Sequence, residues 1–242
     1  MTRIRSTMAA IASTCLAMGI LSCGSSLPPD TIVQVGNQAI TKAALDHWTR
    51  IEAVLAYDPD PTRPVPAGVV PDPPLYTACT RYLKRVKPAA RAANITVIKR
   101  ECEERYRHAR EHVLNILITF RWMLQEGKKW NIYVPDRDAQ RQLLEIKRAQ
   151  FEGSEVKFDD YLKNTGLTLS DELLRIKENR ISAELRQRLM TAKEASGEGM
   201  EGVEVYLREM PRRWTAKTSC HKGYVIPECK EYKGPLPPEA SI

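Results

Sequence analysis

Hydrophobic residues recur every three or four positions along most of the chain, which is the spacing of one face of an α-helix. In residues 41–57 the stripe contains Leu45, Trp48, Ile51 and Leu55, and Thr41 precedes it where a helix N-cap is expected. Similar stripes predict helices over 73–86, 95–127, 135–151, 155–166, 168–190 and 201–210. The pattern therefore predicts a mainly α-helical protein.

The strongest helical pattern lies in residues 95–127. Its main stripe is Tyr106, Ala109, Val113, Ile116, Leu117, Phe120 and Leu124. Leu114, Ile118 and Trp122 widen this stripe, so we expect the part after His112 to be buried on most sides.

One short stretch alternates between apolar and polar residues instead. Residues 32–40, IVQVGNQAI, place Gly36-Asn37 between two extended runs, and this pair tolerates the positive φ angles of a tight turn. Tyr224–Ile226 is the one strand candidate near the other end of the chain. The expected fold is thus a multi-helix module with a small β element.

A proline-rich stretch interrupts the helical pattern after the first helix. Residues 58–74 contain seven of the sixteen prolines of the chain. Proline has no amide hydrogen and fixes φ, so this density excludes a helix interior and favours an extended chain. We predict a long, semi-rigid loop, whose mobility the sequence leaves open.

The first thirty residues are typical of a secreted protein. Arg3 and Arg5 precede a mostly apolar run over 9–21, which is too short for a permanent membrane span of about 20 residues. The run ends in ILSC, which resembles the bacterial lipobox, so Cys23 is predicted to carry the lipid anchor. Residues 1–22 would then be the signal peptide and residues 23–30 a tether. The alternative is a secreted protein in which Cys23 is incidental.

These features predict attachment to the extracytoplasmic face of a bacterial plasma membrane. The mature chain would carry 35 basic and 30 acidic residues, since Arg3 and Arg5 leave with the signal. Outside the cell this balance argues for anionic lipid, wall polymer or acidic polypeptides as partners and against nucleic acid.

The basic residues are concentrated in one region. Seven lysines and arginines and no acidic residue occupy residues 81–100: Arg81, Lys84, Arg85, Lys87, Arg91, Lys99 and Arg100. Either this region is a solvated connector between helices or it is a contact surface for an anionic partner.

Four further cysteines, Cys79, Cys102, Cys220 and Cys229, would lie in an oxidising compartment, where two disulfides are expected. Three pairings are open, and proximity in sequence favours Cys79 with Cys102 and Cys220 with Cys229. The chain has no CxxC motif, so thiol–disulfide exchange is not the predicted activity.

Two stretches together resemble a known family. IVQVGNQAITKAALDHW at residues 32–48 and the helical region from WNIYVPDRDAQ at residue 130 to Met190 are similar to the N-terminal and helical-arm signatures of the SurA/PrsA-type foldases. The resemblance covers residues 31–190. It implies a helical chaperone module over 31–195, followed by a C-terminal segment over 196–242. It also implies, by analogy, that Val33–Val35 pairs with Tyr224–Ile226.

The resemblance also implies a function without catalysis. Foldases of this family carry a parvulin isomerase domain of about a hundred residues, whereas only 42 residues follow Met200 here. The expected function is therefore ATP-independent holding of unfolded, newly secreted polypeptides, without a cofactor, a metal or a catalytic residue. A partner-specific or structural lipoprotein is the alternative, and a prolyl isomerase is a weaker one. The candidate client-binding residues are Trp122, Met123, Trp130, Tyr133, Phe151, Phe158 and Tyr161.

A sharper enzymatic hypothesis concerns His108, Glu111 and His112. They form an H-x-x-E-H motif on a predicted helix, as in zinc metalloproteases, and Glu184 is a candidate third ligand. The two histidines continue a polar stripe away from the apolar face. Enzymes with this motif also have a large α/β domain, which this chain is not expected to form. The motif is therefore interpreted as a solvated helix face.

Overall fold

A computed structural model describes residues 27, 28 and 30–235. The predicted signal peptide over 1–22, the predicted lipidation site Cys23 and most of the predicted tether lie outside the described residues. Within the described part, no helix combines the length and the apolar character needed to cross a membrane.

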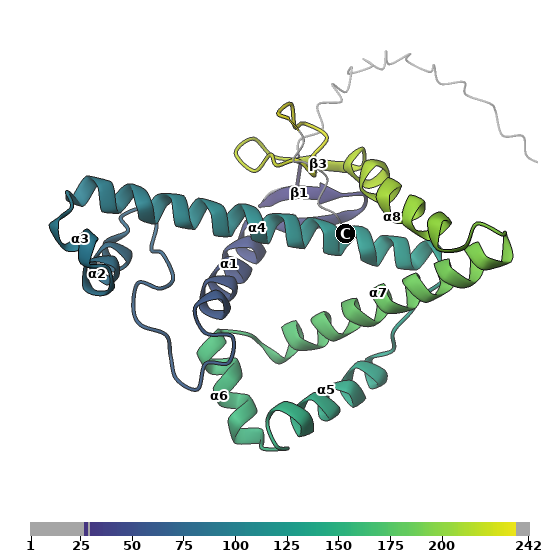
Figure 1. Cartoon of the computed structure of the whole chain (residues 1–242), viewed down its shortest axis with the longest axis horizontal. Helices are drawn as coiled ribbons and strands as arrows, with labels where there is room; N and C mark the ends of the chain where they lie inside the picture. Colours follow the sequence, from purple (N-terminus) through teal and green to yellow (C-terminus); the bar gives the residue numbers. More distant parts are fainter. Residues whose placement is uncertain (1–26, 29, 236–242) are drawn as a thin grey trace, which may run out of the picture.

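The protein is mainly α-helical with a small antiparallel sheet (Figure 1), as predicted. The strands are β1 (Thr31–Val35), β2 (Gln38–Thr41) and β3 (Thr218–Cys220). The helices are α1 (Lys42–Tyr57), α2 (Thr77–Val86), α3 (Pro88–Ala92), α4 (Ile95–Lys129), α5 (Asp136–Gln150), α6 (Glu155–Thr165), α7 (Leu169–Ala195) and α8 (Gly199–Thr215).

Local capping residues fix several helix ends, including the predicted N-cap at Thr41. The Thr41 hydroxyl accepts a hydrogen bond from the amide of Ala44 and caps α1. Thr168 and Asp171 form a reciprocal capping box at the start of α7. Gly166 ends α6 in the left-handed conformation, with φ of 81°.

Several helix boundaries differ from the prediction, and α7 continues past the predicted end at Met190 to Ala195. The helix expected over 73–86 begins only at Thr77, because the carboxylate of Asp72 accepts hydrogen bonds from the amides of Ala78 and Cys79 and fixes the start there. The helix expected over 201–210 continues through Pro211 to Thr215. The extension places Trp214 in the central core, and this packing outweighs the cost of the proline.

The sheet has the order β2-β1-β3, with β1 antiparallel to both neighbours. The predicted hairpin over 32–40 is confirmed. The predicted partner of Val33–Val35 is wrong: Val33 pairs with Cys220 and Val35 with Thr218, so the C-terminal strand is Thr218–Cys220 and not Tyr224–Ile226.

The tertiary contacts of Thr218 explain this correction. Thr218 has no exposed surface, and its hydroxyl accepts a hydrogen bond of 2.8 Å from the indole of Trp122 on α4. Gly223 turns the chain with φ of 93°, so Tyr224–Ile226 folds back over the core instead of extending along β1. The apolar run that resembled a strand is thus a core-covering loop.

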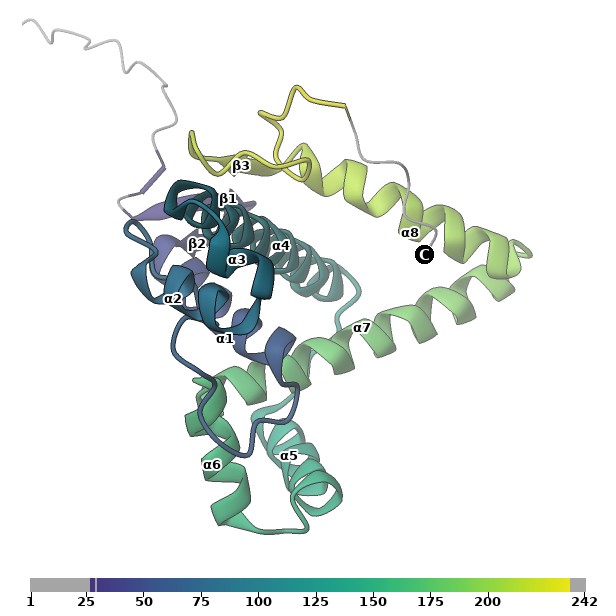
Figure 2. The same cartoon turned by 60° about the vertical axis from the view of Figure 1, so that its left-hand side comes forward.

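The long helix α4 crosses the molecule and takes part in several cores (Figures 1 and 2). The central core lies between the sheet, α1, the second half of α4 and α8, and includes Val33, Leu45, Ile118 and Trp214. Further cores lie among α2, α3 and the start of α4, between α7, α8 and the end of α4, and among α5, α6 and α7.

The two cysteine pairs favoured by proximity in sequence form disulfides. Cys79 on α2 is bonded to Cys102 on α4, with 6.1 Å between the Cα atoms. Cys220 on β3 is bonded to Cys229, with a Cα–Cα distance of 5.7 Å. The second bond holds the C-terminal loop beside the N-terminal hairpin, because Cys220 is the partner of Val33 in the sheet.

Candidate binding groove

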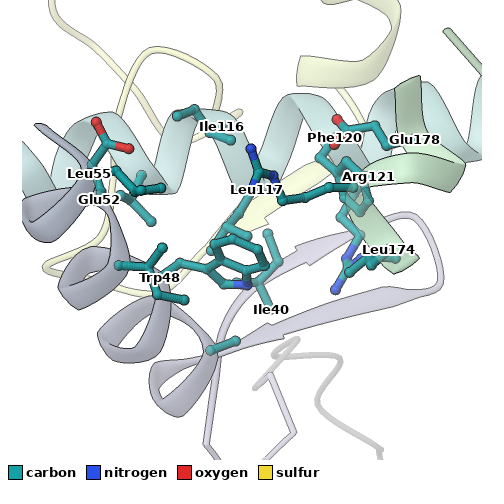
Figure 3. A pocket seen from close by; sticks show the side chains of 14 residues that line it. Ile40, Trp48, Glu52, Leu55, Ile116, Leu117, Phe120, Arg121, Leu174 and Glu178 are labelled. Carbon is teal, nitrogen blue, oxygen red and sulfur yellow. The ribbon is translucent and has the colours of Figure 1, made fainter. Parts of the chain in front are cut away.

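An apolar groove of about 220 Å³ lies between α1, α4 and α7 (Figure 3). Its apolar lining comes from one side of α1, the facing side of α4, and single residues of β2 and α7: Ala44, Trp48, Ile51, Leu55, Val113, Ile116, Leu117, Phe120, Ile40 and Leu174. Charged side chains border it: Glu52 from α1, Arg121 from α4, and Arg175 and Glu178 from α7.

The groove exists because the apolar stripes of α1 and α4 are wider than the surface over which the two helices touch. Leu45, Ile51 and Val54 of α1 are buried, and so are Val113 and Leu117 of α4. Ile116 on the same helix remains 42% exposed, and Trp48 is only partly buried. Apolar surface is thus left accessible beside the core.

Polar contacts fix the walls of the groove relative to one another. The His47 ring on α1 lies 3.0 Å from the carboxylate of Asp171, which caps the start of α7. His112 of α4 lies 3.7 Å from Glu52 of α1, which borders the groove. These contacts hold α7 and α4 against α1.

The charged end of the groove has unusual electrostatics. Burial raises the pKa of Glu178 from 4.5 to about 7, although Arg175 and Arg121 draw it down. Burial also lowers the pKa of Arg121, and Glu178 opposes this shift. Arg175 is held by a hydrogen bond of 2.9 Å to Glu172. Near neutral pH the end of the groove therefore carries guanidinium donors beside a carboxyl group that titrates.

The size of the groove limits what it can hold. Small-molecule and cofactor pockets usually have volumes of about 300–1,000 Å³. At about 220 Å³, this groove fits one or two apolar side chains. Its charged rim adds hydrogen-bonding groups beside this apolar space.

The aromatic residues predicted to bind clients do not line this groove. Trp122 belongs to the central core, and Phe151, Phe158 and Tyr161 pack together among α5, α6 and α7. Their burial assigns Trp122, Phe151 and Phe158 to core packing.

The other three candidates lie near the C-terminal end of α4. Met123 and Trp130 are partly buried against the core shared with α7 and α8, and the Trp130 indole donates a hydrogen bond of 2.9 Å to the Tyr206 hydroxyl. Tyr133 is 79% exposed and borders a separate shallow pocket with Arg188. The structure thus spreads the seven candidates over three cores and one surface position.

The residues that do line the groove were visible in the sequence only as core stripes. Trp48, Ile116 and Phe120 have the spacing of buried helix positions, so periodicity alone assigns them to packing. The one sequence feature that could have indicated a groove is the wide apolar stripe after His112. This stripe is wider than the surface that the neighbouring helices bury.

The H-x-x-E-H residues do not converge. His108 is exposed, Glu111 lies 3.7 Å from Arg107, and His112 faces Glu52. The candidate third ligand, Glu184, accepts a hydrogen bond from Arg188 at 2.8 Å. No group of three or more histidine, cysteine, aspartate or glutamate side chains within the described ranges is arranged to hold a metal ion.

No protein-family model, curated protein or solved structure matches this chain. The resemblance to the SurA/PrsA-type foldases therefore stays a prediction, and the candidate function depends on the groove itself.

Proposed function

We propose that this protein holds extended, apolar segments of polypeptides in the groove between α1, α4 and α7. The observation that carries the proposal is the partly exposed apolar lining, with Ile116 at 42% exposure, next to charged groups at one end. Apolar side chains of a client would leave water in the groove, while Arg121 and Arg175 donate hydrogen bonds to its carbonyl groups.

This function requires no chemical step. Binding by a shallow apolar surface is reversible and tolerant of sequence, which suits a protein that holds unfolded, newly secreted chains. We further propose that the predicted anchor at Cys23 keeps this activity at the extracytoplasmic face of the membrane. Prolyl isomerisation is not part of the proposal, and a proline-peptide assay should show no rate above the uncatalysed one.

The test compares two aspartate substitutions in aggregation assays with several unfolded clients. Ile116→Asp places a carboxylate in the groove at an exposed position, so the fold should tolerate it. We expect suppression of aggregation to need about ten-fold more protein, because losing one buried aliphatic contact costs about 1.5 kcal/mol. Val156→Asp on α6 is the matched control, since Val156 is 71% exposed and lies outside the groove.

Two results would contradict the proposal. One is that the wild-type protein fails to suppress the aggregation of any client. The other is that Ile116→Asp and Val156→Asp suppress aggregation equally well. Retention of one tight partner by the wild-type protein, without general suppression, would instead support the partner-specific alternative.

A further inference from the structure

The end of the molecule farthest from α8 is formed by α2, α3 and the first turns of α4 (Figures 1 and 2). We call residues 81–100 of this region the basic tip. It rests on a small core of its own, which includes Tyr76, Leu83 and Ile98. The Cys79–Cys102 disulfide closes this core, so the tip is a braced structural unit.

The positive charge of the basic tip is largely unneutralised. Among residues 81–100, only Lys87 has a carboxylate partner within the described part of the chain, Glu101 at 2.6 Å. Arg81, Arg85, Arg91 and Arg100 are all exposed. Glu101, Glu103 and Glu104 follow directly on α4, and Glu101 is shared between Lys87 and Arg105.

The same tip exposes aliphatic side chains. Val86 at the end of α2 is 47% exposed, and Ile95 and Val97 at the start of α4 are 55% and 59% exposed. A solvated connector needs no such residues, and a surface for a soluble polyanion gains little from them. Aliphatic side chains among lysines and arginines are typical of segments that lie at a membrane interface.

We propose that the basic tip docks on an anionic lipid surface. Its lysines and arginines attract acidic headgroups, and Val86, Ile95 and Val97 enter the boundary between headgroups and acyl chains. The contact is independent of the binding groove, which lies farther along α4. With a lipid at Cys23 it would add a second, separate contact with the membrane.

The test measures cosedimentation of the full, unacylated chain with lipid vesicles. One set of vesicles contains phosphatidylcholine alone, and the other also contains phosphatidylglycerol. We expect binding to the anionic vesicles to exceed binding to the neutral ones and to fall as salt is raised. Every variant keeps residues 1–30, so any contribution of that segment is common to all measurements.

Two charge variants locate the contact. The triple change Arg85→Ser, Arg91→Ser and Arg100→Ser should weaken binding to anionic vesicles on the order of one hundred-fold, as expected for three charges lost near such a surface. The matched control is Arg137→Ser, Arg186→Ser and Arg208→Ser, three exposed arginines on α5, α7 and α8. It removes the same charge, and we expect a loss of less than ten-fold.

An apolar variant distinguishes lipid from other polyanions. Val86→Ser with Val97→Ser keeps the charge and should weaken binding to anionic vesicles about ten-fold or more. It should leave binding to soluble polyphosphate unchanged. Equal losses in the two triple variants would overturn the proposal, and so would an apolar variant that binds anionic vesicles as well as the wild type. Circular dichroism of each variant verifies that the helices are intact.

Discussion

The two halves of α4 have very different environments although they form one continuous helix. The half over 95–112 buries only Ile98 and Cys102. The half over 113–129 buries eight residues: Val113, Leu114, Leu117, Ile118, Phe120, Trp122, Glu126 and Gly127. The first half is charged and contains the last residues of the basic tip, whereas the second half contacts the sheet, α7 and α8.

The difference shows two ways of stabilising one helix. In the second half, tertiary packing covers most of the circumference, which is the usual source of helix stability in proteins. In the first half the packed surface is small, and the Cys79–Cys102 bond supplies the constraint that packing lacks. We therefore expect disruption of the second half to destabilise the whole protein and disruption of the first half to open the structure locally.

The largest effect is expected at Glu126, in the packed half. Its carboxylate is 1% exposed and accepts hydrogen bonds from the Trp214 indole at 2.6 Å, from Lys129 at 2.8 Å and from the Tyr206 hydroxyl. Glu126→Ala leaves these donors without their acceptor. We expect the free energy of unfolding, measured in urea, to fall by about 4 kcal/mol.

The matched control lies in the other half of α4. Glu111 is partly exposed, and its only ion pair in the described chain is with Arg107 at 3.7 Å. Glu111→Ala should change the free energy of unfolding by less than about 0.5 kcal/mol. A similar loss in both variants would refute the distinction between the two halves.

A smaller, local effect is expected when the basic tip loses its disulfide. Replacing Cys79 and Cys102 by alanine removes a cross-link over 23 residues, which is worth about 3 kcal/mol in the loop-entropy model. Because the tip has its own core, we expect this loss to appear as local opening. Hydrogen exchange should accelerate in residues 77–102.

Amides around Trp122 should keep their exchange rates in that variant. The comparison is Cys220→Ala with Cys229→Ala, which frees a strand paired with Val33 in the central core. That variant should accelerate exchange in β1 as well as in β3. Uniform acceleration throughout the chain after loss of Cys79–Cys102 would show that the tip is not an independent unit.

Most of the helices could be predicted because their signals are local. The caps at Thr41 and Thr168, the turn at Gly36-Asn37 and the stop at Gly166 each depend on a few neighbouring residues. The partner of β1 could not be found in this way. Thr218 looks polar in the sequence, and its burial is decided by Trp122, which lies 96 positions away.

The groove was harder to predict for a related reason. A helical stripe identifies which side of a helix is apolar, but not how much of that side a neighbour covers. Ile116 and Leu117 are adjacent on α4, yet Leu117 is 8% exposed and Ile116 42%. Arg121 and Glu178 come together only because α7 packs beside α4.

The smallest effect is expected at Glu178, where the packed half of α4 meets the groove. The folded protein holds the pKa of this carboxyl at about 7, against the ordinary value of 4.5 for a glutamate, chiefly because of burial. Between these two pH values the unfolded chain releases a proton that the folded protein keeps, so stability falls as the pH rises through this window. Glu178→Gln removes this penalty.

We therefore expect Glu178→Gln to be more stable than the wild type by about 1 kcal/mol at pH 8, a value reduced because solvent reaches this half-buried side chain. At pH 4, where the carboxyl is mostly protonated in both states, the two proteins should unfold at nearly the same urea concentration. The control is Glu104→Gln, which removes the same charge at an exposed position on the first half of α4, away from the groove. If the difference in free energy of unfolding between Glu178→Gln and the wild type is the same at both pH values, burial does not raise the pKa of this carboxyl. The charged end of the groove would then be more open to water than the packing of the second half of α4 implies.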